Sequence, residues 1–297
     1  MHYISAIYAI YFMMTITYNL PMNKIKKFAV VGHPIAHSKS PLIHGLFAKQ
    51  FDLLLSYEKF DFPPDQFQCT LDELQEQGYN GLNITLPFKK NAFLYCNHLS
   101  AKARQTESVN TIIFKKNGVY GDTTDGLGLV NDLSLNKVKL ASSNILLLGA
   151  GGAAQGVLPD LISNQPTTLS IYNRTLEKAE MLVNKYKAAA GKNNVGLLVF
   201  NPITDNFNFD VVINATSAGI LGSELPIASN AFQAKAFYYD MTYGVETAFL
   251  KEAKKSKAKY SDGLGMLVCQ AAESFRLWHD GRSPNIQKVI DQLKKSF

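Results

Sequence analysis

A glycine-rich segment in the middle of the chain has the residue types and spacing of a binding site. Gly149, Gly151 and Gly152 follow an apolar run and precede a helix-length stretch, with Ala154 at the third position of a G-x-G-x-x-A spacing. Gly149 permits a tight turn, and Gly151 lets the backbone approach a phosphate. Because the first N–H groups of a helix attract anions, this strand–turn–helix order predicts a dinucleotide-binding site. An ordinary glycine turn without a ligand remains the alternative.

The segment after the next predicted strand indicates which dinucleotide is bound. An NAD site usually places Asp or Glu about 20 residues further on, where it binds the ribose 2′-hydroxyl. This chain has Arg174 and Thr175 there, and the first acidic residue after the predicted strand is Glu177. A guanidinium presents forked donors to a 2′-phosphate. The sequence therefore favours NADP over NAD.

Polar segments precede the glycine turn at places where an ordinary core strand would be apolar. Ser38 and Ser40 put two hydroxyls just before a predicted helix, which suits a carboxylate, although Ser40 could instead be only a helix cap. The other segments carry amide, hydroxyl and charged side chains: Asn83, Thr85, Lys89, Asn110, Thr111, Asp122 and Asp125. Lys89 or Asp125 alone would be an ordinary surface charge. Their combination marks a candidate site.

The elements that must position these residues alternate between strand and helix along most of the chain. This order is typical of α/β proteins with mainly parallel sheets, and Asn117-Gly118 predicts a hairpin turn. Strands are expected at residues 28–32, 55–60, 81–86, 109–114, 119–121, 144–148, 169–173, 195–200, 210–215 and 236–240. Helices are expected at residues 41–51, 64–77, 152–163, 176–190, 264–280 and 284–295.

Composition bounds the class of protein. The 297 residues suggest two domains, and 46% hydrophobic content with a net charge of only +6 excludes disorder. Cys69, Cys96 and Cys269 are too few for a disulfide scaffold, and neither they nor the six histidines have metal-site spacing, so no metal is expected. Lysines outnumber the four arginines and are scattered, unlike a nucleic-acid-binding face, so no nucleic-acid partner is expected.

The first 23 residues carry no Lys, Arg, Asp or Glu. They lack the positive charge and cleavage site of a secretory signal, and polar residues such as Ser5 and Asn19 interrupt any membrane span. We expect the chain to start functionally at Met22, with residues 1–21 an extension of doubtful origin and no membrane association. The alternative is that this apolar run packs on the body or lies on a membrane surface.

Taken together, these segments resemble the shikimate dehydrogenase family from residue 28 to the C-terminal helices. The motifs that carry the resemblance are Ser-Lys-Ser-Pro (38–41), Asn-x-Thr-x-Pro-Phe-Lys (83–89), Val-Asn-Thr (109–111), Gly-Asp-x-Thr-Asp-Gly (121–126), Gly-Ala-Gly-Gly-Ala (149–153), Asn-Arg-Thr (173–175), Asn-Ala-Thr-Ser-x-Gly (214–219), Asp-Met-x-Tyr (240–243) and Asp-Gly-Leu-Gly-Met-Leu-Val-x-Gln-Ala (262–271). The family reduces 3-dehydroshikimate to shikimate with NADPH, on the route to chorismate and the aromatic amino acids.

The resemblance implies a two-domain α/β fold. Residues 22–124 and 263–297 would form an α/β substrate domain with a mainly parallel sheet, onto which the C-terminal helices pack back. Residues 125–262 would form a Rossmann-like NADP-binding domain. We also expect small-molecule partners, a cytoplasmic location, and a monomer or homodimer.

The resemblance also assigns roles to the matching residues. Lys89 and Asp125 would form the catalytic pair. The substrate carboxylate would be bound by Ser38, Ser40 and Tyr243, and the ring hydroxyls by Asn83, Thr85, Asn110 and Gln270. The cofactor pyrophosphate would be held by Gly149, Ala150, Gly151, Gly152 and Ala153, and its adenosine phosphate by Asn173, Arg174, Thr175 and Lys178. Met241, Gly263 and Met266 would border the nicotinamide, and residues 214–219, including Thr216, would close the cofactor side.

Two departures and three rival interpretations remain. Thr123 stands where the family often has Asn, and Lys178 stands where a second Arg is common, which gives a point charge rather than a fork. A quinate/shikimate dehydrogenase that accepts NAD would usually have an acid where Arg174 stands. A non-catalytic Rossmann-like binding protein would be expected to lose the Lys89–Asp125 combination, and a folate-type dehydrogenase would not need the two serines.

Overall fold

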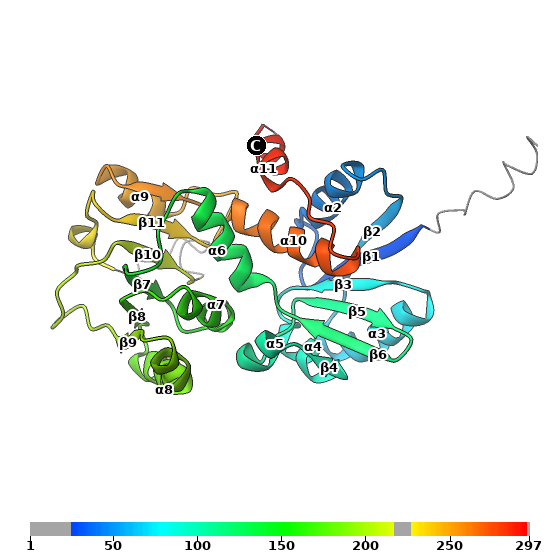
Figure 1. Ribbon diagram of the computed structural model, residues 1–297, viewed down its shortest axis with the longest axis horizontal. Helices are drawn as coiled ribbons and strands as arrows, with labels where there is room; N and C mark the ends of the chain where they lie inside the picture. The colour runs from blue at the N-terminus through cyan, green and yellow to red at the C-terminus, as the bar shows by residue number, and fades with distance from the viewer. Residues whose placement is uncertain (1–24, 217–226, 296–297) are drawn as a thin grey trace, which may run out of the picture.

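Two six-stranded sheets lie side by side in the computed structural model, which describes residues 25–216 and 227–295 (Figure 1). The expected start at Met22 lies outside the described residues, as do residues 217–219 of the segment expected to close the cofactor side. No helix in the described ranges is long and apolar enough to cross a membrane.

The first sheet has the strand order β2-β1-β3-β5-β6-β4. Its strands are β1 (Lys26–Gly32), β2 (Leu55–Asp61), β3 (Gly81–Ile84), β4 (His98–Leu99), β5 (Thr111–Lys115) and β6 (Gly118–Asp122). Three pairings are parallel, β1 with β2 and β3 and β4 with β6, whereas β5 runs antiparallel to β3 and β6. The expected mainly parallel sheet and the hairpin at Asn117-Gly118 are therefore confirmed.

Helices cover both faces of the first sheet. They are α2 (Ser40–Lys49), η1 (Pro64–Gln66), α3 (Phe67–Glu76), α4 (Lys89–Tyr95) and α5 (Ala101–Thr106). One core combines the sheet with apolar side chains of α3, α4 and α5. A second core joins α2 to the two C-terminal helices, α10 (Leu264–Trp278) and α11 (Ile286–Lys294). The expectation that the C-terminal helices pack back on the first half of the chain is therefore confirmed.

The second sheet is parallel throughout, in the order β12-β11-β10-β7-β8-β9. Its strands are β7 (Asn144–Leu148), β8 (Thr168–Tyr172), β9 (Gly196–Val199), β10 (Val211–Asn214), β11 (Phe237–Asp240) and β12 (Lys259–Ser261). Its helices are α6 (Asp125–Leu135), α7 (Gly152–Ser163), α8 (Leu176–Lys192), η2 (Ser229–Ala231) and α9 (Ala248–Lys255). The strand order reverses between β7 and β10, which creates the switch point where α/β sheets bind ligands.

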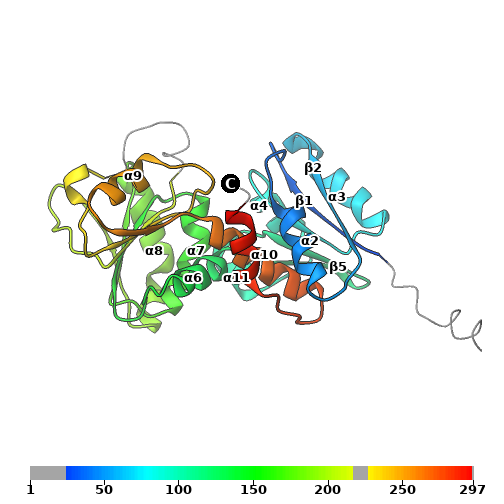
Figure 2. The same cartoon turned by 90° about the horizontal axis from the view of Figure 1, so that it is seen from above.

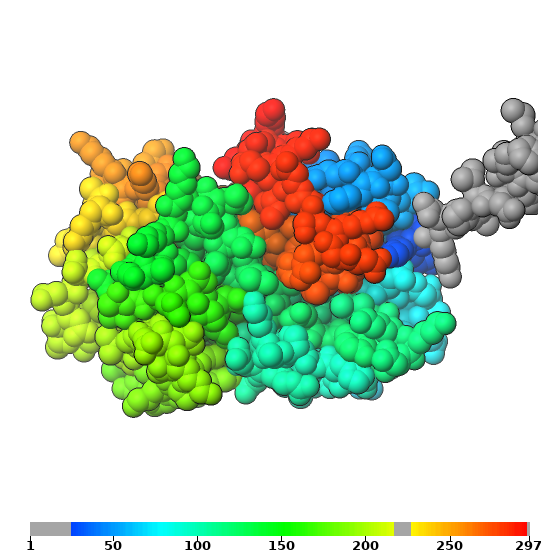
Figure 3. All heavy atoms as spheres, in the orientation of Figure 1, coloured from blue at the N-terminus to red at the C-terminus, as the bar shows by residue number. Residues whose placement is uncertain are grey.

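Helices α6 and α10 lie between the two sheets in both ribbon views (Figures 1 and 2). Their backbones approach closely, because a Cβ added to Gly128 would lie 2.7 Å from the Cβ of Gln270. In the space-filling view, the C-terminal segment fills the surface between the two halves (Figure 3). The expected domain boundaries at residues 124 and 262 stay a prediction.

The sequence patterns missed several short elements. Six elements were not expected: helices α4, α5, α6 and α9 and strands β4 and β12. Most of them are too short to show a periodic pattern, and α6 carries glycines in place of an apolar stripe. Ser40 is the first residue of α2, and Lys39 holds the cap position. The alternative in which Ser40 serves only as a helix cap is therefore wrong.

Two buried histidines lie in the core that joins α2 to α10. His44 stacks on Tyr57 with ring centroids 4.5 Å apart, and His279 stacks on Phe275 at 4.1 Å. Burial lowers the pKa of His44 from 6.5 to about 3, and burial together with nearby positive charge lowers the pKa of His279 to about 4. Both imidazoles are therefore neutral in the folded protein.

We predict that acid destabilises the fold through these histidines. Below pH 6.5 these two histidines bind protons in the unfolded chain but stay neutral in the folded protein. The free energy of unfolding that is present above pH 6.5 is therefore lost as the pH falls toward the folded-state pKa values of about 4 for His279 and about 3 for His44. Each histidine should cost about 2 kcal/mol of unfolding free energy between pH 8 and pH 5. Urea denaturation at several pH values measures this loss.

The control uses a variant that keeps the ring stacking. His44→Phe/His279→Phe should flatten the loss between pH 8 and pH 5, whereas His98→Gln, at an exposed histidine, should leave it unchanged. A parental slope in the double variant would contradict the prediction.

Candidate active site

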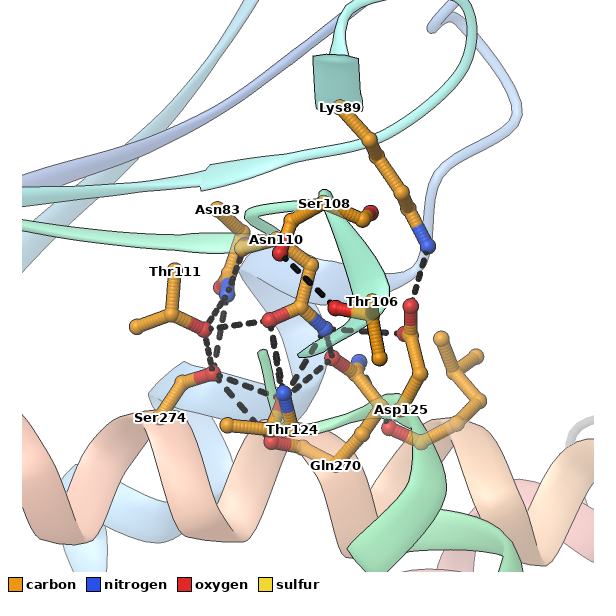
Figure 4. Close-up of polar contacts among 11 residues, drawn as sticks. Asn83, Lys89, Thr106, Ser108, Asn110, Thr111, Thr124, Asp125, Gln270 and Ser274 are labelled. Atoms are coloured by element: carbon orange, nitrogen blue, oxygen red, sulfur yellow. Dashed lines mark hydrogen bonds and ion pairs between the residues drawn. The ribbon is translucent and has the colours of Figure 1, made fainter. Parts of the chain in front are cut away.

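A lysine–carboxylate pair joins the first residues of two helices. Lys89 begins α4, Asp125 begins α6, and Lys89 Nζ donates to Asp125 Oδ2 over 2.6 Å (Figure 4). The Lys89 and Asp125 side chains are 27% and 15% exposed, so the pair lies in a recess that water still reaches. The structure thus brings together the two charges that the sequence singled out. An ammonium group fixed in this way can give a proton to an oxyanion and stabilise it.

Asn110 fixes the carboxylate from the other side. Its Nδ2 donates to Asp125 Oδ1 over 2.8 Å and to Thr124 Oγ1 over 2.9 Å. Its Oδ1 accepts from the backbone N–H of Thr124 and the hydroxyl of Thr111. The Oε1 of Gln270 on α10 lies 3.3 Å from the same Nδ2 (Figure 4). The amides therefore form a network that fixes the direction of the Asp125 carboxylate.

A second chain of hydrogen bonds runs from the same network toward the serines. Asn83 Nδ2, on β3, donates to Ser274 Oγ over 2.9 Å, and Tyr57 donates its hydroxyl to Asn83 Oδ1 over 2.7 Å. Tyr57 also bonds to Ser40, while burial raises its pKa well above the usual value and keeps the phenol protonated. Ser40 and Ser38 in turn face each other at 3.2 Å. The polar residues predicted from separate motifs thus form one continuous cluster.

A cavity of about 740 Å³ opens beside this cluster, between the turn after β1 and the loop after β11. It is lined by Ala36, His37, Ser38, Lys39, Pro41, Leu42, Lys59, Tyr243, Gly244 and Val245. Lys59 donates to the carbonyl of Ala36 over 2.6 Å and so holds the turn in place. Burial raises the pKa of Tyr243, which leaves its hydroxyl a donor. Hydroxyls and ammonium groups among the lining residues of a partly apolar cavity suit a small carboxylate ligand.

Thr85 directly follows β3 and lies beside Gly32 at the end of β1. Its methyl group leaves no room for a side chain at position 32, because a Cβ there would lie 2.5 Å from Thr85 Cγ2. Gly32 therefore lets the ends of β1 and β3 approach each other.

The glycine turn has the form that a pyrophosphate requires. Gly149 has φ +107°, and Gly151 is the N-cap of α7. A Cβ added to Gly151 or Gly152 would meet no atom within 4 Å, so the turn faces open space at the start of the helix. Ala150 N–H donates to Asn173 Oδ1 over 3.1 Å, which ties the turn to the end of β8. Free helix N–H groups facing open space fit a diphosphate group.

The residues after β8 fit a further phosphate. Arg174, Thr175 and Lys178 are all exposed at the start of α8. Asn173 differs from them, because its amide is bonded to the backbone of Ala150 and of Thr175. Asn173 therefore supports the turn, and the two cations remain to meet an anion.

The other side of the switch point is formed by the ends of β10 and β11. Thr216 donates its hydroxyl to Asn214 Oδ1 over 2.7 Å. A Cβ at Gly263, the N-cap of α10, would lie 2.2 Å from the carbonyl oxygen of Met241. Met266 follows in the first turn of α10 and is buried. Thr216 lies against the glycine turn, since a Cβ at Gly149 would lie 3.1 Å from Thr216 Cγ2.

The sequence analysis named Thr111 without giving it a role, and it missed three further members of the cluster: Tyr57, Thr124 and Ser274. Ser274 had a usable signal, because it stands four residues after Gln270 on a predicted helix and so on the same face. Tyr57 had none, since its role depends on which strand pairs with β1.

We predict that Ser274 stabilises the network. Ser274→Ala leaves Asn83 Nδ2 with only the longer contacts to Asn110 O (3.3 Å) and Thr111 Oγ1 (3.4 Å). In a buried site this loss should lower the free energy of unfolding by about 1–3 kcal/mol, as measured by urea denaturation. Ser283→Ala, at an exposed serine, should change it by less than about 0.5 kcal/mol. Equal stability of both variants would argue against the network.

Three family models match successive parts of the chain. Residues 30–112 match the shikimate dehydrogenase substrate binding domain, residues 132–233 match shikimate / quinate 5-dehydrogenase, and residues 263–294 match the shikimate 5'-dehydrogenase C-terminal domain.

The chain is also similar to individual proteins over nearly its whole length. It is 45% identical over 270 residues to a Methylobacillus flagellatus protein named shikimate dehydrogenase (NADP(+)), covering 90% of this chain and 98% of the relative. A crystal structure of an Ael1 enzyme from Pseudomonas putida matches with a TM-score of 0.83 and 35% identity, over 90% of this chain and 98% of that one. Shikimate 5-dehydrogenase from Thermus thermophilus, in complex with NADP(H) and shikimate, matches with a TM-score of 0.82 and 29% identity, over 92% of this chain and 100% of that one.

Proposed function

Because this chain belongs to the shikimate dehydrogenase family, we propose that it catalyses the reversible NADPH-dependent reduction of 3-dehydroshikimate to shikimate, a step of chorismate and aromatic amino-acid biosynthesis. The observation that carries the proposal is the Lys89–Asp125 contact of 2.6 Å, within one cluster with the residues around the cavity. A non-catalytic Rossmann-like binding protein would be expected to lose this lysine–aspartate combination, whereas an ammonium group fixed in this way suits a general acid.

We propose that the cavity holds the substrate. Ser38, Ser40 and Tyr243 bind the carboxylate with their hydroxyls. The ring hydroxyls meet Asn83, Thr85, Asn110 and Gln270. The supporting observation is continuity, because Tyr57 joins Ser40 to Asn83 and so fixes the distance between the two sets of donors.

Lys89 and Asp125 act on the carbonyl oxygen of the bound ketone. NADPH, when bound, supplies the hydride. Lys89 donates a proton to the oxygen as negative charge develops on it, and in the oxidation of shikimate it takes the proton back. Asp125 holds the ammonium group in place and balances its charge, and Asn110 holds Asp125.

The cofactor contacts come from the switch point of the second sheet. Gly149, Ala150, Gly151, Gly152 and Ala153 hold the pyrophosphate at the start of α7. Arg174 and Lys178, with Thr175, meet the 2′-phosphate, and Asn173 fixes the turn beside them. Met241, Gly263 and Met266 border the nicotinamide, and Thr216 closes the cofactor side. The cytoplasmic location and the monomeric or homodimeric state stay predictions.

We predict that Lys89→Ala lowers kcat by at least about 100-fold, the lower end of what a positioned general acid contributes. The KM for shikimate should change much less, because the carboxylate and ring contacts remain. Steady-state oxidation of shikimate, followed by NADPH absorbance, measures both. Lys90→Ala is the matched control, since Lys90 is the exposed neighbour on α4 and should retain parental kcat. Near-parental turnover in Lys89→Ala would show that another group donates the proton.

We predict that Arg174→Ala impairs NADPH use and leaves NADH use nearly unchanged, because only NADPH carries the 2′-phosphate. Loss of one charge-assisted bond of about 1.5–3 kcal/mol should raise the KM for NADPH by about 10- to 150-fold. Initial rates at varied cofactor concentration test this. Arg104→Ala removes another exposed arginine and should affect neither cofactor. Equal losses with both cofactors would reject a role for Arg174 in choosing between them.

A further inference from the structure

A second carboxylate lies against the helix turn that carries Asp125. A Cβ added to Gly126 would lie 2.2 Å from Asp160 Oδ2, so the Asp160 side chain occupies the space that this glycine leaves. One turn earlier on the same face of α7, a Cβ at Gly156 would lie 3.6 Å from Asp125 Oδ2. Two successive turns of α7 therefore pack on the start of α6, Gly156 against Asp125 and Asp160 against Gly126.

The Asp160 carboxylate has a cation from the other half of the protein. Lys102, on α5, places its Nζ 2.5 Å from Asp160 Oδ1. The Asp160 side chain is 9% exposed, whereas that of Lys102 is 35% exposed. A buried carboxylate is strongly disfavoured without a partner, so Lys102 compensates the charge that Asp160 puts beside α6.

Three further contacts hold the same region together. Gln155 Nε2 donates to the carbonyl of Thr106 over 2.6 Å, and Tyr186 donates its hydroxyl to the carbonyl of Gln105 over 2.8 Å. Lys185 pairs with Glu107 at 2.8 Å. These contacts join the end of α5 to α7 and α8 without the Lys102–Asp160 pair, so changes to that pair leave the two halves connected.

The other charges around the start of α6 have partners of their own or face solvent. On β6, Asp122 accepts from the Ser100 hydroxyl over 2.5 Å. On α10, Arg276 pairs with Glu273 at 2.6 Å, and the side chains of that helix in the network are neutral. On α4, Lys90 is exposed. The Lys102–Asp160 pair is thus the ion pair that packs directly on the turn of Asp125.

We propose that Asp160, with Lys102 as its counter-ion, is a positioning residue for the Lys89–Asp125 pair. This inference rests on the proposed function. By filling the space at Gly126, Asp160 fixes the first turn of α6 and so the direction of Asp125. Because the charges of Lys102 and Asp160 compensate each other, the pair places no net charge beside Lys89, and only removal of one member alone shifts the pH at which Lys89 releases its proton.

Removing the charge of Lys102 and removing the charge of Asp160 should shift the pH dependence of kcat in opposite directions. A merely structural role would not produce this pair of shifts. In Lys102→Gln the uncompensated carboxylate of Asp160 favours protonated Lys89, so the rising limb of kcat for shikimate oxidation should move about 0.5–1 pH unit to higher pH. In Asp160→Asn the limb should move to lower pH, because a negative charge beside the pair is lost. Lys102→Gln/Asp160→Asn should return the limb near its parental position. Asp160→Ala, which empties the space at Gly126, should lower kcat about 10-fold with KM for shikimate unchanged.

The same variants are titrated by NMR on protein labelled with ¹³C-lysine, with the Lys89 signal assigned through Lys89→Arg. The pKa of Lys89 should follow the kinetic shifts. Lys185→Gln removes a lysine from another ion pair of the same region and should move neither readout.

The outcomes separate the two proposals. One outcome is that the parental protein does not oxidise shikimate, while the pKa of Lys89 still shifts in the expected directions in the two single variants. This would support the positioning role and reject the proposed function. Parental turnover with no shift in either readout, or shifts of the same sign in both single variants, would overturn the positioning role.

Discussion

The close approach of α6 and α10 is the constraint on which the rest of the structure depends. Gly128 on α6 lies against Gln270, and a Cβ at Gly265 on α10 would overlap the carboxylate of Asp132. Side chains at either glycine would force the helices apart, which a packed interior tolerates poorly. The close approach of these two backbones brings Asp125, at the start of α6, and Gln270, on α10, to the same Asn110.

The cluster around Asn110 explains how a charged pair can stay fixed in a recess. Unpartnered polar groups are costly in such a place, so each must be bonded. The carboxylate of Asp125 has a donor at each oxygen, from Lys89 and from Asn110. Neutral amides and hydroxyls supply the remaining bonds, which adds no charge that would compete with Lys89. Such a preorganised arrangement stabilises a developing oxyanion without having to reorganise during the reaction.

The sequence predicted the repeating elements better than the short ones. The strand β7 is a continuous apolar run and α8 is amphipathic, whereas α6 begins Asp-Gly-Leu-Gly and has neither signal. Lys89 and Asp125 could be found from their types and motifs. Asp160 could not, because nothing local reveals that a residue 35 positions later packs on the turn of Asp125. Contacts of this kind depend on topology, which a linear pattern does not contain.

Helix α10 connects the two halves of the site through a spacing of four residues. Met266 lies in its first turn, near the ends of β10 and β11, and Gln270 and Ser274 follow one and two turns later on the same face. Gln270 reaches Asn110, and Ser274 reaches Asn83 and Thr111. The helix ends at Trp278, whose Nε1 donates to the carbonyl of Ile112 on β5. Because a helix is stiff over this length, the distance between Met266 at the switch point and the network around Asn110 is fixed within one element, whereas the loops on either side can vary without changing it.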